Sequence, residues 1–256
     1  MELLKVIFLG IVQGLTEFLP VSSSGHLVIF QKLFNINDEA LTLEVFLHFG
    51  TLIAVMIAYW DDIVEIITFK PEYRNFTYYI LLGSVPAGVI GILYKDIIER
   101  VFDEIIIVGF MLLITGVLLW LSDRIRSQDR DMEDMNSFDS IIVGCAQAFA
   151  ILPGVSRSGS TIVAGLFKGL DRKLAAKYSF LLSIPVIGGA TLLESFDLMK
   201  EGFGTLGPVE LVSGTIAAAI AGYFAIKLLV KLVNQERLSL FAYYCWGLGL
   251  IIILFF

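Results

Sequence analysis

The chain has 256 residues, of which 57% are apolar and 17% are charged, and its formal net charge is −7. Its mean hydropathy is +0.84. Soluble domains carry about 25% charged residues, so this composition excludes an ordinary soluble protein. The sequence has no basic patch of the kind that binds nucleic acid. It predicts an all-α integral membrane protein that lies in a lipid bilayer.

The chain opens with two short apolar segments, 3–19 and 25–34, separated by a break rich in Pro, Ser and Gly. Each is short for a spanning helix, which needs about 20 apolar residues. The first segment contains Gln13, Thr16 and Glu17 and no small-residue cleavage site, so we do not expect a cleaved signal peptide. Two short segments around a break predict a re-entrant helical hairpin over 3–34.

Longer apolar runs predict three transmembrane helices after this hairpin, at 43–60, 76–94 and 104–122. The acidic stretch from Asp123 to Asp139 is interpreted as a solvated connector. A second pair of short segments then predicts a hairpin at 140–169. It is followed by three further spans, at 174–195, 209–230 and 238–256.

The two hairpins are related by an internal repeat. Residues 10–13 and 19–25 resemble residues 144–147 and 152–159, and both Gly10 to Gly144 and Gly25 to Gly159 are 134 positions apart. We therefore divide one membrane domain into half 1, residues 1–133, and half 2, residues 134–256. Three crossings in each half give the second half the opposite orientation, so the sequence predicts two inverted-topology repeats with a site between their broken helices.

Basic residues orient this topology. Loops 61–75, 123–138, 168–177 and 227–237 share one side, with Lys70, Arg74, Arg124, Arg126, Arg130, Lys168, Arg172, Lys173, Lys177, Lys227, Lys231 and Arg237. The other side holds Lys5, Lys32, Lys95, Arg100 and Lys200. The positive-inside rule makes the richer side cytoplasmic, so both termini are expected outside the cell.

Chemistry-bearing residues gather at the first break. Gln13 and Glu17 are four positions apart and share a helix face, and Ser22, Ser23 and Ser24 open the next helix before Gly25 and His26. Ser23 and His26 are three positions apart and can meet on that helix. A carboxylate, hydroxyls and an imidazole at one helix start supply a base, a nucleophile and backbone donors.

The second break predicts an anion site. Ser156, Arg157, Ser158 and Thr161 lie at the start of a helix, where free N–H groups and the helix dipole favour negative charge. The guanidinium adds a planar fork that matches phosphate oxygens. Two such helix starts facing each other would bind a strongly anionic group such as a diphosphate.

Structural interpretations remain beside these. Serines and glycines at helix breaks also serve close packing, and Glu17 and Arg157 could form a purely structural ion pair. Charges at membrane depth cost roughly 2.5–3.5 kcal/mol on insertion scales and usually serve function, which favours chemistry. His48 lies in the next span, with no other candidate site residue near it in the sequence. A packing role and a functional role are therefore equally open for His48. Gln147, which mirrors Gln13, is interpreted as structural or supporting.

Residues 13–26 read Gln-Gly-Leu-Thr-Glu-Phe-Leu-Pro-Val-Ser-Ser-Ser-Gly-His, and residues 153–161 read Pro-Gly-Val-Ser-Arg-Ser-Gly-Ser-Thr. They resemble the two signature motifs of the bacitracin-resistance type undecaprenyl-diphosphate phosphatases, and the resemblance covers the whole chain. It implies hydrolysis of undecaprenyl diphosphate to the monophosphate, which recycles the lipid carrier of cell-wall synthesis. It also implies a plasma-membrane or inner-membrane location, an active site open to the outer face, and a divalent cation, Mg²⁺ or Ca²⁺.

The resemblance also assigns roles to residues. Glu17, Ser23, His26 and Arg157 match the family's active-site positions. The expected substrate-binding residues beside them are Ser22, Ser24, Gly25, Ser156, Ser158 and Thr161. The first motif position, Glu or Gln in the family, is Gln13 here, so Gln13 and Glu17 would hold the metal with one carboxylate and the substrate phosphates would supply the rest.

The resulting hypothesis has Ser23 attack the terminal phosphorus with His26 or Glu17 as base, and attack by an activated water is the alternative. A lipid-phosphate flippase is the rival function, because it would need a similar anion site in a similar architecture. A flippase needs the arginine but not a nucleophile with its base. A scaffold without a ligand would leave Glu17 and Arg157 unexplained. The oligomeric state is open, with a homodimer among the options.

Overall fold

The structure is a computed structural model that describes residues 2–34, 40–102, 104–125, 129–201 and 206–255. Within these ranges the named elements are all helices. Those up to residue 122 are α1 (Glu2–Phe18), α2 (Ser23–Phe34), α3 (Ala40–Ala58), α4 (Trp60–Ile67), the short 3-10 helix η1 (Pro71–Tyr73), α5 (Arg74–Leu93), α6 (Lys95–Phe102) and α7 (Ile105–Ser122). They are followed by α8 (Ser137–Phe149), α9 (Arg157–Phe167), α10 (Arg172–Glu201), α11 (Pro208–Asn234) and α12 (Ser239–Phe255).

The long helices confirm an all-α membrane protein. Five of them, α3, α5, α7, α10 and α11, are long and apolar enough to cross a bilayer. The helix at the sixth expected span, α12, is apolar and has 17 residues, which is the lower end of the usual range for spanning helices. Helix α10 has 30 residues and extends beyond the expected 174–195.

Two short helices lie where the sequence predicted loops. Helix α4 starts with Asp61 and Asp62 in its first turn, where carboxylates complement the helix dipole, and its apolar residues recur at helical spacing. Helix α6 has the same amphipathic character, with Asp96 in its first turn and Arg100 in its last. Both are only 8 residues long, so neither can cross a bilayer.

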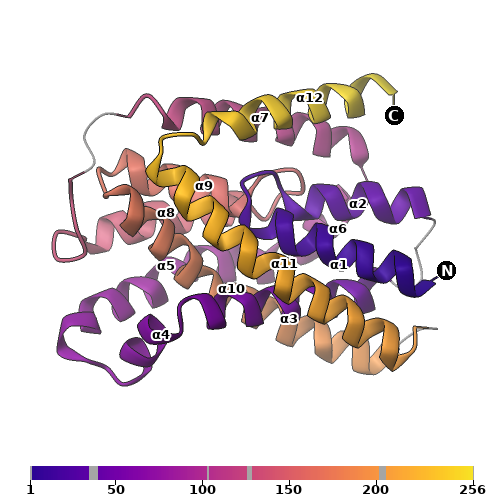
Figure 1. The fold of residues 1–256 in the computed structure, drawn as a ribbon, viewed down its shortest axis with the longest axis horizontal. Coiled ribbons are helices and arrows are strands. Elements are labelled where there is room, and N and C mark those ends of the chain that lie inside the picture. Colours follow the sequence, from indigo (N-terminus) through magenta and orange to yellow (C-terminus); the bar gives the residue numbers. More distant parts are fainter. Residues whose placement is uncertain (1, 35–39, 103, 126–128, 202–205, 256) are drawn as a thin grey trace.

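The two helical hairpins approach each other from opposite ends of the molecule (Figure 1). Helices α1 and α2 pack together and come from the end that holds both described chain termini, whereas α8 and α9 come from the end with α4. Helix α1 packs against α11 and α8 packs against α5, while α3 and α10 pack together between them. Helices α7 and α12 form a further pair along one edge.

Glycines permit the closest of these helix contacts. A Cβ on Gly10 of α1 would lie 2.5 Å from the carbonyl oxygen of Gly214 on α11, and a Cβ on Gly144 of α8 would collide with the backbone of Gly83 on α5. Small residues at a crossing point let two backbones approach, as is common between membrane helices. These two contacts therefore fix how each hairpin lies against a spanning helix of the other half of the sequence.

The acidic connector differs from its prediction at its ends. Asp139 is fully buried and receives both terminal nitrogens of Arg130, at 3.2 and 2.6 Å, with the Lys168 ammonium 3.5 Å away. Asp123 accepts the backbone N–H groups of Leu238 and Ser239 at the start of α12. The interpretation as a solvated connector was wrong for Asp139, because Arg130, Lys168 and the N–H of Asn136 hold its carboxylate inside the protein. Asp123 is half-buried and caps the start of α12.

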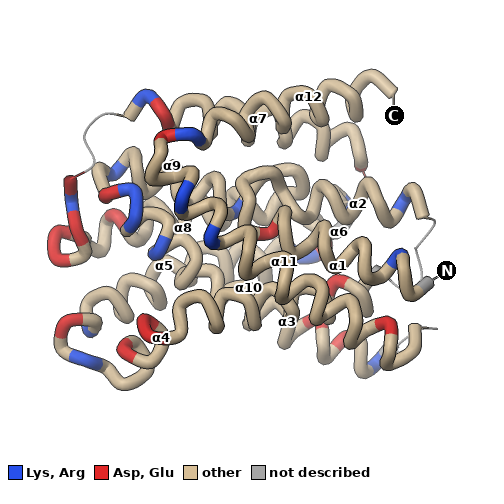
Figure 2. The backbone as a smooth tube through the Cα atoms, viewed as in Figure 1, with Lys and Arg blue, Asp and Glu red and all other residues tan. Residues whose placement is uncertain are grey.

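Charged residues gather towards the two ends of the molecule, and the helices between them carry fewer (Figure 2). The outer faces of the spanning helices instead expose large apolar side chains, such as Leu81 of α5 and Val212, Ile216 and Phe224 of α11. A soluble protein rarely exposes so continuous an apolar surface. In a bilayer these side chains contact lipid, and the helices satisfy their backbone groups internally.

Candidate active site

The first hairpin turns at a strained serine. Helix α1 ends at Phe18, and Pro20 prevents its continuation because it has no N–H to donate. Ser22 has a φ of 69°, in the left-handed region that L-residues rarely adopt. Its hydroxyl accepts the N–H of Gly25 at 3.3 Å and so caps the start of α2. Backbone strain of this kind concentrates at functional sites.

The second hairpin is built by the same means. Gly154 has a φ of 93°, which suits glycine, and Ser156 caps α9 by accepting the N–H of Gly159 at 3.1 Å. Thr115 of α7 secures the turn, because its hydroxyl donates to the carbonyl of Gly154 at 3.0 Å and accepts the N–H of Ser156 at 3.1 Å. The expected helix start with hydroxyls and an arginine is confirmed.

The two hairpin tips touch. A Cβ added to Gly25 would lie 3.4 Å from the Cα of Gly154, and a Cβ added to Gly159 would lie 3.2 Å from the Cβ of Pro20. Glycine at these positions therefore lets the starts of α2 and α9 lie side by side. This contact brings the corresponding breaks of the two repeats into one site.

Glu17 is the centre of the site. Its Oε1 accepts a hydrogen bond from Nη2 of Arg157 at 2.8 Å. Its Oε2 accepts hydrogen bonds from the hydroxyl of Ser23 at 2.6 Å and from the side-chain nitrogen of Gln13 at 3.0 Å. The Glu17 side chain is 94% buried and the Arg157 side chain 86% buried. The structure thus brings together four residues that the sequence singled out, a carboxylate, a hydroxyl, an amide and a guanidinium.

The second side of the Arg157 guanidinium faces α10. Its Nη1 lies 3.4 Å from the carbonyl oxygen of Ser179, at the long end of a hydrogen bond. The hydroxyl of Ser179 in turn lies 2.6 Å from that of Thr161, and Thr161 donates to the carbonyl of Arg157 at 2.8 Å. The sequence did not predict that Ser179 lies at the site, because a serine within an apolar span gives no signal of its own.

His26 does not meet Ser23, contrary to the expectation from their spacing. Its Nδ1 lies 2.7 Å from the carbonyl oxygen of Ser22, and its Nε2 lies 2.6 Å from the hydroxyl of Tyr244 on α12. A carbonyl can only accept, so Nδ1 carries the proton and a neutral imidazole accepts from Tyr244 at Nε2. The lone pair of His26 is therefore directed at Tyr244, while the Ser23 hydroxyl donates to Glu17.

The other expected binding residues surround the two helix starts. Ser24 lies with its hydroxyl 3.3 Å from that of Ser22, and the hydroxyl of Ser158 lies 3.3 Å from that of Ser156. Ser22, Ser156, Ser158 and Thr161 are buried, while Ser23 and Ser24 are partly exposed. The hydroxyls open to an incoming ligand are thus those of Ser23 and Ser24.

His48 is the residue that the sequence left undecided. Its Nε2 lies 3.9 Å from Oε2 of Glu17, and its Nδ1 lies 2.8 Å from the carbonyl oxygen of Glu44. The side chain is 28% exposed. The available signal was the pair of polar residues, Glu44 and His48, four positions apart in an otherwise apolar span.

The site can contribute to a metal ion but does not surround one. In the described ranges no three His, Cys, Asp or Glu side chains cluster as metal ligands. Gln13 directs its side-chain nitrogen to Glu17, which leaves its Oε1 buried and without a hydrogen-bond partner. Mg²⁺ is commonly held by one or two protein oxygens together with substrate phosphates. Gln13 and Glu17 fit that kind of site.

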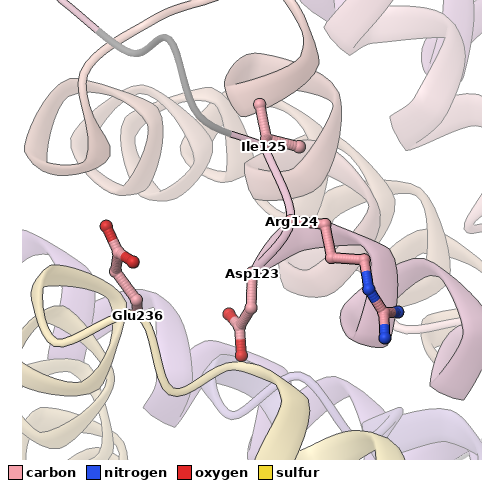
Figure 3. Close-up of a pocket in the computed structure, with 4 residues that line it drawn as sticks. All are labelled: Asp123, Arg124, Ile125 and Glu236. Atoms are coloured by element: carbon pink, nitrogen blue, oxygen red, sulfur yellow. The ribbon is translucent and has the colours of Figure 1, made fainter.

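A cavity of about 460 Å³ lies elsewhere, at the turn after α7 (Figure 3). It is lined by Asp123, Arg124, Ile125 and Glu236. Asp123 caps α12, as described above, and the guanidinium carbon of Arg124 lies 3.1 Å from the ring centre of Trp120. These two charged groups are already used within the protein, so the cavity is not a second candidate for the active site.

Fold and site together define a class of protein. It is an all-helical membrane protein in which two broken helices bring a carboxylate, a serine hydroxyl and an arginine together beside two helix starts. Such a group can hold an anionic ligand and activate a hydroxyl. Comparison with known proteins gives the family: the sequence model described as "Bacitracin resistance protein BacA" matches residues 6–251, and the chain belongs to this family.

Named relatives are similar over their whole length. A protein of Halothermothrix orenii called "Undecaprenyl-diphosphatase" is 54% identical over 254 residues, covering 99% of this chain and 98% of the relative. A protein of the same name from Alkaliphilus metalliredigens is 44% identical, covering 100% of this chain and 99% of the relative. Another, from Carboxydothermus hydrogenoformans, is 42% identical, with 99% and 97% covered. The family suggested by the two motifs is therefore confirmed.

Proposed function

We infer that this protein hydrolyses undecaprenyl diphosphate to undecaprenyl phosphate and inorganic phosphate in the membrane. The observation that carries the inference is Glu17, held between Ser23 of its own hairpin and Arg157 of the other, in a chain with diphosphatase relatives over its full length. The test is phosphate release from undecaprenyl diphosphate by the purified protein in detergent. Release at the rate of a Glu17→Ala variant would contradict the inference.

The proposed first step is attack by Ser23 on the terminal phosphorus. Its hydroxyl already donates to Glu17 at 2.6 Å, so the proton can leave to Oε2 as the Oγ–phosphorus bond forms. The bond between that phosphorus and the bridging oxygen breaks, and its electron pair stays on the departing undecaprenyl phosphate. Water then attacks the phosphorus on Ser23, and the Oγ–phosphorus bond breaks to release inorganic phosphate. Glu17 lies next to Oγ and can return the proton to it.

Arg157 and the helix starts supply the charge stabilisation. Nη2 of Arg157 holds Glu17 closely, whereas Nη1 makes only a 3.4 Å contact with Ser179 and can turn to a phosphate oxygen. The starts of α2 and α9 lie side by side at the hairpin tips, and the dipoles of both helices favour an anion there. Donors that are fixed before the reaction cost no reorganisation in the transition state.

A divalent cation, Mg²⁺ or Ca²⁺, fits as a partner of the substrate. Oε1 of Gln13 and the carboxylate of Glu17 would hold it from the protein side. Such an ion neutralises charge on the diphosphate oxygens. The buried Oε1 of Gln13, which has no other hydrogen-bond partner, is the observation that favours this role.

Inverted halves are the proposed architecture, with half 1 at residues 1–133 and half 2 at residues 134–256. Helix contacts support them: α1 packs on α11 as α8 packs on α5, and α3 pairs with α10 as α7 pairs with α12. The glycine contacts show the same relation between the halves: Gly10 of half 1 contacts Gly214 of half 2, and Gly144 of half 2 contacts Gly83 of half 1. We place the end with both termini outside the cell, because the opposite loops carry most of the basic residues.

The flippase alternative is less well supported. A flippase needs an anion site that can open to both sides, and it has no use for a serine that donates to a buried carboxylate. The Ser23–Glu17 hydrogen bond and the diphosphatase names of the relatives both favour hydrolysis. A flippase would move the lipid without releasing phosphate, so the same assay separates the two functions.

A further inference from the structure

We propose that a groove between α7, α8 and α9 holds the first isoprene units of the substrate, the part of the polyprenyl chain nearest the diphosphate. The inference deepens the proposed function and rests on it. It gives a place to the apolar part of the substrate, and it concerns residues that have no role in the steps described above. The groove would therefore decide which diphosphates the enzyme prefers.

The groove opens towards the lipid. It has a volume of about 210 Å³, and helix α9 packs against both α7 and α8 along it. Of its lining residues, Ser160 and Val163 are buried, whereas Ile114, Phe149 and Phe167 are exposed. The base of the groove is thus on α9, and apolar side chains from all three helices form its rim.

One end of the groove lies at the candidate active site. Ser160 follows Arg157 by one turn of α9. Ile114 precedes Thr115, whose hydroxyl binds the turn of the second hairpin, and Phe149 is the last residue of α8 before that turn. A chain that leaves a diphosphate bound at the hairpin tips can therefore enter the groove directly.

The groove runs in the direction that the substrate requires. From Ser160 to Phe167 it extends roughly 10 Å along α9, away from the tips and towards the end of the molecule that holds α4. That end is the proposed cytoplasmic one. A lipid of the outer leaflet has its headgroup directed outwards and its chain directed inwards, so its chain would follow α9 once the diphosphate is at the tips.

Ser160 carries a hydroxyl that nothing in the described part of the protein satisfies. The side chain is 5% exposed, and its Oγ has no hydrogen-bond partner there. A buried hydroxyl without a partner is unfavourable, more so in an apolar groove. Because it lies one turn from Arg157, Ser160 can donate to an oxygen at the lipid end of the diphosphate. The serine would then mark the point where the polar part of the substrate meets its chain.

The corresponding place in half 1 is filled by aromatic rings. At the repeat offset of 134, Ser160 corresponds to His26 and Ala164 corresponds to Phe30. His26 binds Tyr244 of α12, and the two rings are parallel with centroids 5.7 Å apart. Phe30 packs edge-on against an aromatic ring of α1 at 5.0 Å. Small side chains in half 2 leave open what these rings fill in half 1, so the chain is expected on half 2.

The size of the groove limits what it can hold. Its volume is below the range of about 300–1,000 Å³ found for pockets of drug-sized ligands, so most of the polyprenyl chain stays in the bilayer. Moving a chain from lipid to an apolar groove gains little free energy. The groove instead orients the diphosphate towards Ser23 and Arg157. The preference for longer chains should therefore level off after the first few isoprene units.

Photolabelling of the wild-type protein in detergent tests the location directly. The probe is undecaprenyl diphosphate with a diazirine on the second isoprene unit from the diphosphate. The label is expected in segments 114–118, 146–149 and 160–167. Excess unlabelled undecaprenyl diphosphate should remove it, and excess phospholipid should not. A label on the outer face of α11 instead, or one that phospholipid removes equally well, would overturn the proposal.

Filling the groove tests its effect on the reaction. Ala164→Phe should lower kcat/KM for undecaprenyl diphosphate by roughly tenfold or more, and should affect a diphosphate with a single isoprene unit much less. Gly247→Phe on α12 is the matched control, because a Cβ there would meet no atom within 4 Å. It should keep the wild-type rate with both substrates. An equal fall for both substrates in Ala164→Phe, or the same selective fall in Gly247→Phe, contradicts the groove.

Removing the unpartnered hydroxyl tests the entrance of the groove. Ser160→Ala should lower kcat/KM by roughly fivefold for both substrates, the effect of one neutral hydrogen bond. A wild-type rate in this variant would remove Ser160 from the proposal.

These results are separable from those for the proposed function. A wild-type protein that releases no phosphate from any prenyl diphosphate defeats the function. An active wild type whose label lies outside the groove defeats only the present proposal. If Ala164→Phe does not fold, the labelling of the wild type decides alone.

Discussion

Replacing Arg157 by lysine separates the charge of this side chain from its shape. Arg157 makes two contacts in the site, Nη2 to Glu17 at 2.8 Å and Nη1 to the carbonyl of Ser179 at 3.4 Å. A lysine ammonium can keep the first contact, and the second is long. The stability loss should therefore be near that of one weak hydrogen bond, about 1 kcal/mol. Arg157→Met, by contrast, leaves Glu17 buried without its counter-ion and should cost about 3–5 kcal/mol.

Activity should respond differently from stability. A guanidinium can hold Glu17 with one nitrogen and a phosphate oxygen with another, whereas an ammonium is a single point charge. If the second nitrogen acts on the transition state, Arg157→Lys loses one fixed donor, and kcat/KM should fall by roughly 10²-fold, or about 2.7 kcal/mol. The lysine variant should therefore be a folded protein with poor catalysis.

The measurement is a melting curve in detergent beside steady-state phosphate release, for wild type, Arg157→Lys and Arg157→Met. The wild type should be the most stable, Arg157→Lys slightly less stable, and Arg157→Met the least stable. Most of the activity should already be lost in Arg157→Lys. Full activity in Arg157→Lys would show that charge alone suffices. Loss of folding in Arg157→Lys together with loss of activity would make Arg157 a structural residue, and either result would refute the reasoning above.

Three further outcomes follow from the site and the topology. Cysteines introduced at Pro71 and Asp96 should be labelled from opposite sides of the membrane by an impermeant reagent, and labelling from one side would contradict the inverted halves. Ser23→Ala should lose at least roughly two decades of rate, whereas the matched Ser24→Ala should lose much less; near-normal turnover in Ser23→Ala would make water the attacking group. A chelator should slow phosphate release, and Mg²⁺ or Ca²⁺ should restore it; an unaffected rate would remove the metal from the proposal.

Much of the helical pattern could be read from the sequence, because length and apolarity decide it. The expected spans near 43–60, 76–94, 104–122, 174–195, 209–230 and 238–256 each coincide with a helix, and both hairpins break where proline and serine interrupt the apolar run. Helices α4 and α6 were missed, because their amphipathic pattern extends over only 8 residues each. The extra length of α10 was missed because its last turns are polar.

The sequence predicted which residues form the site, because their types are unusual in a membrane span, but it did not predict all of their hydrogen-bond partners. Glu17, Ser23 and Arg157 stood out because charges and hydroxyls are rare at membrane depth, and the structure brings all three together. The partners of the histidines did not follow from spacing. Ser23 and His26 are one turn apart, yet the positive φ of Ser22 starts α2 so that Ser23 faces Glu17 while His26 faces Tyr244.

The division of the active site between two hairpins has an energetic reason. A charge at membrane depth costs roughly 2.5–3.5 kcal/mol on insertion scales, and Glu17 and Arg157 each carry one. Their 2.8 Å ion pair offsets that cost, but it exists only when the tips of both hairpins touch at Gly25, Gly154 and Gly159. Among the described residues, the guanidinium that pairs with Glu17 comes from the other half. The contact that assembles the catalytic group is therefore the contact that lets both charges remain in the membrane, which ties the integrity of the fold to the presence of the site.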